Sequence, residues 1–120
     1  MKIAFTTSGK DLNAPLDSRF GRALQFLIYD LETNTFDVED NNQNLNAAQG
    51  AGIQSAQNIA RLGVKALVTG HCGPKAFRVL VAAGIKIYNT SAGTVAEALD
   101  LYRTGKLSEA VSADVEGHWA

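Results

Sequence analysis

Short apolar runs bounded by turn-forming residues recur along the chain and predict five β-strands. These runs lie at residues 2–7, 25–31, 35–39, 64–69 and 85–88. The run at 64–69 is almost continuously apolar, which is typical of a parallel strand covered on both faces. The run at 35–39 instead alternates between apolar and acidic residues, which predicts an edge strand with one face in water.

Apolar residues at helical spacing predict three helices, at about residues 50–62, 74–83 and 95–104, each followed by a glycine that ends it. Pro74 suits a first helical position, because the N–H group that it lacks is not needed there. Thr94 and Glu97 form a capping box at the start of the third helix. The residues expected to face the core are Ile53, Ala56, Gln57, Ala60 and Leu62, then Phe77, Leu80 and Val81, then Val95, Ala98, Leu99 and Tyr102.

The elements follow one another as three strands and then helix, strand, helix, strand, helix. The second and third strands form a hairpin, in which Asn34 is available for a left-handed backbone position. Right-handed crossovers place the last two strands beside the first. We therefore expect an α/β fold with a five-stranded mixed sheet of order 3-2-1-4-5 and helices on both faces. Residues 1–105 form a single domain in this scheme, and residues 106–120 form a loosely attached tail.

The composition agrees with one globular domain, since 46% of the residues are apolar, 19% are charged and the net charge is -1. This balance gives no reason to expect nucleic acid or an anionic membrane as a partner. A single cysteine excludes an internal disulfide, and no apolar run approaches the roughly 18 residues of a membrane span. The start of the chain has no charged-then-apolar leader, so we expect a soluble, cytoplasmic protein.

Three loops follow the carboxyl ends of the parallel strands, where open α/β sheets bind ligands: residues 8–22, 70–74 and 89–93. Acids are few in these loops, and the loop at 70–74 also opens a helix, whose free amide groups attract anions. We therefore expect a cationic cleft, rich in N–H donors, that binds a compact anion. It would gather Lys10, Arg19, Arg22, His71 and Lys75, the hydroxyls of Thr7, Ser8, Thr90 and Ser91, and glycine amides.

Several of these residues also have a purely structural interpretation. Gly70 and Gly73 serve equally well to make a tight strand-to-helix turn. The adjacent His71 and Cys72 do not have the spacing of a structural zinc site, and no second Cys/His pair completes four ligands. Cys72 is either a thiol activated by the helix N-terminus or a buried residue without chemistry. Arg19 and its neighbours serve equally well as solvated charges.

Common enzyme motifs are absent from the sequence. Gly9-Lys10 lacks the preceding glycine of a phosphate-binding loop, and the glycines at 50 and 52 follow an amide-rich loop and not a strand. There is no Gly-x-Ser-x-Gly motif, and the first strand carries no carboxylate for a two-metal nuclease.

Residues 14–23, 50–54 and 69–77 resemble the dinitrogenase iron-molybdenum cofactor biosynthesis family. The resemblance extends to about residue 105, and it implies a ribonuclease H-like fold. It also implies a non-catalytic carrier of an anionic metal-sulfur cluster that is held without covalent attachment. The details are most similar to a branch of the family whose cluster is a molybdenum-copper sulfide.

Two residues depart from the family pattern. Many relatives carry histidine where this chain has Arg19, which favours ion pairing over direct metal coordination. Relatives commonly have an apolar residue at the position of Cys72, which argues against an essential role for this thiol, although it is able to bind copper as a soft ligand. Cys72 and His71 are the candidates for direct ligation, and no ligation is predicted. We expect the cluster's sulfides to rest on Leu16 or Phe20. The cofactor-binding residues expected from the loops and the resemblance together are Ser8, Lys10, Leu16, Arg19, Phe20, Gly21, Arg22, Gly70, His71, Cys72, Gly73, Lys75 and Thr90.

Three other functions fit the sequence. One is a carrier of an iron-molybdenum cofactor precursor for nitrogenase assembly. Another is a regulatory or scaffolding module without a bound cluster, for which the resemblance implies ATPases of the septum-positioning type as partners. The last is a small enzyme that acts on a phosphate or a thiol through Cys72. The metals bound to protein purified without oxygen distinguish these functions.

Overall fold

The five predicted strands form one mixed sheet of order β3-β2-β1-β4-β5, which confirms the predicted topology. The computed structural model describes residues 1–41 and 51–111. β1, β2 and β3 are antiparallel neighbours, whereas β4 and β5 run parallel to β1. The strands are β1 (Lys2–Thr7), β2 (Gln25–Asp30), β3 (Thr35–Asp40), β4 (Ala66–Thr69) and β5 (Lys86–Asn89). The helices are the 3-10 turn η1 (Phe20–Arg22), α2 (Ala51–Arg61), α3 (Pro74–Ala82) and α4 (Val95–Arg103).

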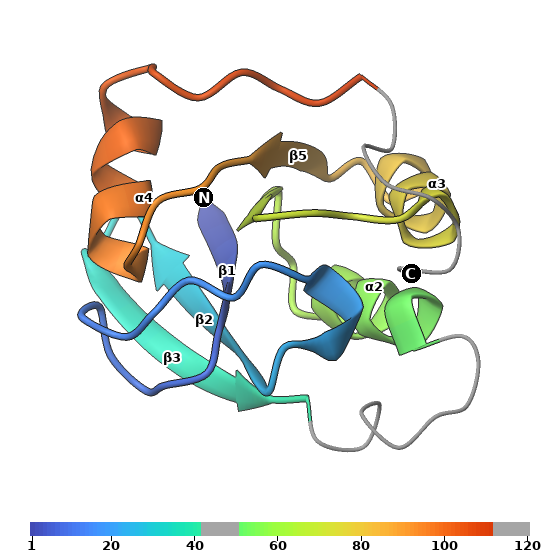
Figure 1. The fold of residues 1–120 in the computed structure, drawn as a ribbon, viewed down its shortest axis with the longest axis horizontal. Coiled ribbons are helices and arrows are strands. Elements are labelled where there is room, and N and C mark those ends of the chain that lie inside the picture. Colours follow the sequence, from blue (N-terminus) through green and yellow to red (C-terminus); the bar gives the residue numbers. More distant parts are fainter. Residues whose placement is uncertain (42–50, 112–120) are drawn as a thin grey trace.

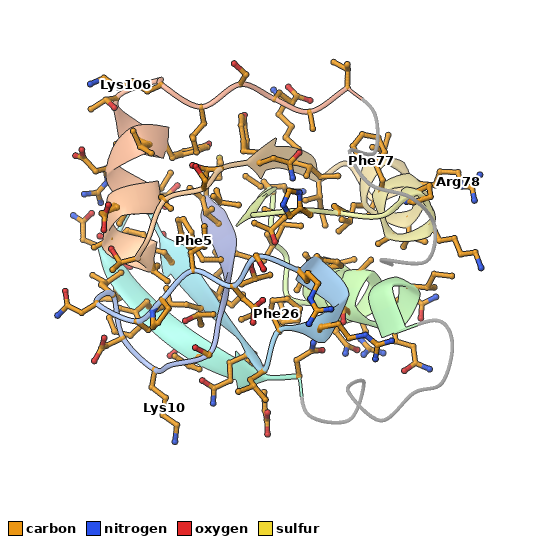
Figure 2. The ribbon with its side chains drawn as sticks, viewed as in Figure 1. Phe5, Lys10, Phe26, Phe77, Arg78 and Lys106 are labelled. Carbon is orange, nitrogen blue, oxygen red and sulfur yellow. The ribbon has the colours of Figure 1, made fainter. Side chains whose placement is uncertain are left out.

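Helices cover both faces of the sheet, as predicted, and each face has its own core. Ile59 of α2 and Leu80 of α3 pack on one face with Phe26 of the sheet. Leu99 of α4 packs on the other face with Phe5. Figure 1 shows α4 on one side of the sheet and α2 and α3 on the other, and Figure 2 shows Phe5 and Phe26 within the two layers. Alternation along the strands produces this division, because successive side chains point to opposite faces.

The turns also agree with the prediction. Asn34 adopts φ 58°, the left-handed position that closes the hairpin, and the three glycines that follow the helices have φ between 71° and 79°. α3 begins at Pro74, after Gly73 as its N-cap. The N–H of Glu97 donates to Thr94 Oγ1 at 3.1 Å, so Thr94 caps α4.

Two of the predicted core positions are wrong. Gln57 is exposed in α2, where Ala56 and Ile59 are buried instead. Val81 of α3 is 54% exposed, because the neighbouring Leu80 points into the core and consecutive helical residues lie about 100° apart. In α3 the side that packs against the sheet is therefore narrower than the arc of apolar residues on the helix surface.

The segment after α4 lies along the outer side of β5. The N–H of Ala110 donates to the carbonyl of Ile87 at 2.7 Å, and Glu109 forms an antiparallel bridge with Tyr88. The tail expected from Lys106 is thus held to the sheet over its first residues. Residues 112–120 lie outside the described residues. Most of the irregular loop expected at 40–46 lies outside them as well. No helix within 1–41 or 51–111 is long and apolar enough to cross a membrane.

Candidate functional site

A cleft of about 430 Å³ opens at the carboxyl ends of β1, β4 and β5. It lies where the sequence places the three loops that follow these strands. The residues that line it are Leu16, Asp17, Ser18, Gly70, His71, Asn89, Thr90, Ser91 and Ala92. All three loops therefore contribute to the cleft.

The first wall, residues 16–18, is fastened to the end of β1 by its backbone. The N–H of Asp17 donates to the carbonyl of Thr6 at 2.8 Å, and the hydroxyl of Thr7 donates to the carbonyl of Pro15 at 2.8 Å. Thr7 was expected to offer its hydroxyl to the ligand, but this residue is buried and its hydroxyl donates to the loop instead. The loop is therefore long but fixed at its middle.

A buried pair of hydroxyls lies beneath this wall. Thr6 Oγ1 is 2.9 Å from Thr69 Oγ1 and 2.9 Å from the carbonyl oxygen of Asp17. A hydroxyl donates one hydrogen only, so Thr69 donates to Thr6 when Thr6 donates to Asp17. This chain joins β4, β1 and the loop, and it satisfies two polar groups that are completely buried.

Gly70 allows the first wall to approach the end of β4. A Cβ atom at this position would lie 2.5 Å from the carbonyl oxygen of Ser18 and 2.6 Å from its Cα. Both are backbone atoms, which cannot rotate away as a flexible side chain would. Any side chain here would push the loop off the strand, so the glycine is required by close packing.

The other walls are joined to Gly70 and to one another. Asn89 donates from Nδ2 to the carbonyl of Gly70 at 3.2 Å, and the N–H of Leu16 donates to the carbonyl of Gly93 at 3.1 Å. The N–H of Phe20 donates to the carbonyl of His71 at 3.1 Å. Each loop thus bonds to at least one of the others, and the cleft is preorganised.

The lining is polar but not cationic. Within the described residues it holds one imidazole, one carboxylate, three hydroxyls and one amide, and no lysine or arginine. Asp17 Oδ1 accepts the N–H of Arg19 at 3.0 Å, which offsets part of its negative charge. The backbone of Arg19 pairs with that of His71, so this exposed arginine stands at the rim of the cleft.

The structure brings some of the expected site residues together and not others. Leu16, Gly70, His71 and Thr90 line the cleft. Lys10 lies far from it and extends into solvent on the side away from β5 (Figure 2). Ser8, Arg22 and Lys75 are not among the lining residues, and the buried Gly21 and Gly73 are not either.

Phe20 and Cys72 belong to the core and not to the cleft. Each side chain is 2% exposed, and both lie in the layer beneath α2 and α3. The ring of Phe20 packs against Phe26 with 5.6 Å between centroids, and Cys72 Sγ lies 3.8 Å from the carbonyl oxygen of Gly73. The apolar surface for a ligand comes from Leu16 and Ala92 instead.

The amino end of α3 does not line the cleft either. Its N-cap, Gly73, is buried and has no side-chain cap. The lining stops two residues before it, at His71. The lining therefore comes from residues 16–18, from Gly70 and His71, and from residues 89–92.

Asp17, Ser18, Asn89 and Ala92 line the cleft but were not predicted as binding residues. Ser18 lies in the long first loop, and Asn89 and Ala92 belong to the segment that ends β5. The sequence could have indicated these residues only through the topology, which places both segments at the carboxyl ends of the parallel strands. Within the described residues, no group of three or more His, Cys, Asp and Glu side chains is placed to hold a metal ion.

Comparison with known proteins gives consistent matches over most of the chain. Residues 1–105 match the family model described as dinitrogenase iron-molybdenum cofactor. The apo form of the orange protein from Desulfovibrio gigas is 37% identical with a TM-score of 0.93, covering 95% of this chain and 96% of that one. A protein from Thermotoga described as a putative NifB protein is 35% identical with a TM-score of 0.81, covering 95% and 98%. A protein of Methanocaldococcus jannaschii is 32% identical over 111 residues, which is 91% of each chain.

Proposed function

The chain belongs to the dinitrogenase iron-molybdenum cofactor family, and on that premise we propose that it binds and carries an anionic metal-sulfur cluster in the cleft. The cluster is cargo, held by hydrogen bonds and ion pairing without covalent attachment. We propose no chemical reaction for the protein. The sequence features at residues 14–23, 50–54 and 69–77 resemble the branch of the family that carries a molybdenum-copper sulfide, and they favour this cluster.

The observation that carries this proposal is a preorganised cleft with several hydroxyl groups in its lining. Ser18, Thr90 and Ser91 each contribute a hydroxyl that can donate a hydrogen bond to a ligand. Because the walls are already hydrogen-bonded to one another, the free-energy cost of ordering them when a ligand binds is small. A cleft with fixed walls is better suited to bind a rigid, multiply charged ligand than to distort a flexible substrate.

Arg19 supplies the positive charge that the lining lacks. Its backbone lies beside His71 and its side chain is exposed, so the guanidinium can turn toward a guest in the cleft. Arg22 follows one turn later in η1. Charge-assisted hydrogen bonds contribute about 1.5–3 kcal/mol each, so the loss of one or two of them weakens binding about tenfold or more.

The test is anaerobic loading of the purified protein with thiomolybdate and copper(I), followed by a visible absorption spectrum and elemental analysis. We expect the wild type to retain both metals through gel filtration. Replacing Arg19→Ala together with Arg22→Ala should lower metal retention about tenfold or more and leave the circular dichroism spectrum unchanged.

The matched control removes two exposed cations elsewhere, Arg78→Ala and Lys106→Ala, with the same change in net charge. This control should load as the wild type does. Equal metal content in both double variants would contradict a role for the arginines at the rim. A wild-type protein that retains no metal would contradict the proposal itself.

The family's description favours a second cargo, the iron-molybdenum cofactor or its precursor. Iron and molybdenum on protein purified from its own source would support this candidate, and molybdenum with copper would support the first. ATPases of the septum-positioning type are the proposed protein partners. A partner that binds the cluster-free protein as tightly as the loaded one would favour a regulatory module.

A further inference from the structure

The two edges of the sheet differ in how they are covered. Residues 109 and 110 lie along β5, as described above. β3 pairs only with β2, and within residues 1–41 and 51–111 no segment pairs with its outer side. Figure 1 shows β3 as the outermost strand on its side of the molecule.

β3 has backbone hydrogen-bonding groups along its outer side, and no strand within residues 1–41 and 51–111 pairs with them. It is six residues long, and all of them except the half-buried Val38 are exposed. In an edge strand, alternate residues direct their N–H and C=O groups outward. A further strand would therefore find a continuous backbone partner along Thr35–Asp40.

The two faces of β3 have different chemistry. Phe36 and Val38 lie on the face of the sheet that α4 covers, opposite Tyr29 and Leu27 of β2. Phe36 remains 36% exposed there. The intervening acids, Asp37 and Glu39, lie on the other face, where α2 packs. A neighbouring strand continues both faces, so its side chains alternate between apolar and acidic surroundings.

Two hollows adjoin the acidic face. One of about 230 Å³ lies between the end of β3 and α2, and its lining includes Glu39, Asp40 and Arg61. A smaller one of about 60 Å³ includes Asp37, Glu39 and Lys2. Glu39 lines both hollows, and the two are together called the recess. Its charged residues include Asp37 and Glu39 of β3 as well as Lys2 and Arg61.

A second copy of the chain does not fit this edge. Two copies related by a two-fold axis pair antiparallel, and residues directly opposite each other must lie on the same face. The two alignments that pair five residues of each strand place Asp37 opposite Asp37, or Asp37 opposite Glu39 of the other copy. Like charges directly opposite each other are destabilising. The acids thus disfavour self-pairing over the length of β3 and favour a basic partner.

We propose that β3 is the docking edge for an extended segment of another protein in which lysine or arginine alternates with apolar residues. The segment adds to the sheet as a further strand. Its basic side chains meet Asp37 and Glu39 and enter the recess, and its apolar side chains cover Phe36. Main-chain hydrogen bonds hold the segment, and the alternating pattern sets the specificity.

The test uses a capped seven-residue peptide that alternates valine and lysine, added to ¹⁵N-labelled protein. We expect amide shifts concentrated at Thr35–Asp40 and the facing residues of β2. A peptide with glutamate in place of lysine should bind at least tenfold more weakly. A version with N-methylated backbone should also lose binding, because strand addition needs its N–H groups.

The variant Asp37→Lys plus Glu39→Lys should reverse the preference, so that it binds the glutamate peptide and not the lysine peptide. The control Glu32→Lys plus Asp100→Lys carries the same change in charge and should behave as the wild type. The proposal is overturned by unshifted β3 amides at millimolar peptide, by equal binding of the two peptides, or by dimerisation of the protein through β3.

Discussion

At the scale of single residues, the cleft depends most on the absence of a side chain at Gly70. In Gly70→Ala the new Cβ must displace the backbone of Ser18, which lies 2.5–2.6 Å away. We expect a loss of about 1–3 kcal/mol in the free energy of unfolding, typical of overpacking, together with weaker metal retention. Urea unfolding and the metal-loading assay measure the two effects.

Gly93→Ala is the matched control, because the nearest atom to its Cβ is the flexible side-chain Oε1 of Glu97 at 3.4 Å. It changes the same residue type at the same cleft rim. Unfolding and loading of this variant should stay close to wild type. Identical results for the two glycines would show that the contact with Ser18 does not shape the site.

Tyr102 provides a prediction about alkaline pH. Burial, and secondarily the charge of Tyr88, raises the pKa of Tyr102 above its ordinary value of 10.0. The folded state therefore favours the neutral phenol, a contribution that is complete below pH 10 and is lost as pH rises through the raised value. Tyr102→Phe should show a smaller fall in unfolding free energy between about pH 9 and pH 11 than wild type. Parallel curves for the two proteins, measured by urea unfolding, would contradict this.

At the scale of elements, the fold was predictable because each strand and helix carries its own local signal. Alternation identified β3 as an edge strand, and continuous apolar residues identified β4 as a covered one. Asn34 marked the hairpin, and glycines marked the helix ends. The error at Val81 arose because α3 is apolar over a wider arc than the sheet can cover, whereas Gln57 was placed in the core by its spacing along α2 and not by its polarity.

The site was less predictable than the elements around it. The topology fixed which loops meet, so Leu16, His71 and Thr90 were found. Side-chain direction within the 8–22 loop depends on contacts that no local pattern shows. Phe20 turns into the core and Lys10 into solvent for this reason, and the cleft is lined by hydroxyls where cations were expected.

At the scale of the whole molecule, the cleft and the β3 edge are separate surfaces. The cleft is built at β1, β4 and β5, whereas β3 lies beyond β2 on the opposite side of the sheet. A partner docked along β3 would leave the mouth of the cleft open. Changes to Asp37 and Glu39 should therefore leave metal loading unaffected, and the two proposals can fail independently.

The two sheet edges also lead to a prediction about association. β3 is protected by charge, but β5 is protected by the segment whose Ala110 N–H bonds to Ile87. Ala110→Pro removes that donor, so the segment should detach and uncover a strand with only one charged residue, Lys86. We expect concentration-dependent self-association, visible by analytical ultracentrifugation, and a loss of about 1 kcal/mol of stability.

The control variant Val111→Pro restricts the same segment but leaves the Ala110 N–H in place, so it should remain monomeric wherever wild type does. If Ala110→Pro stays monomeric as well, the segment at 109–110 does not shield the edge of the sheet. The short length of β5 must then be sufficient protection, because a four-residue strand offers few hydrogen bonds to a second copy.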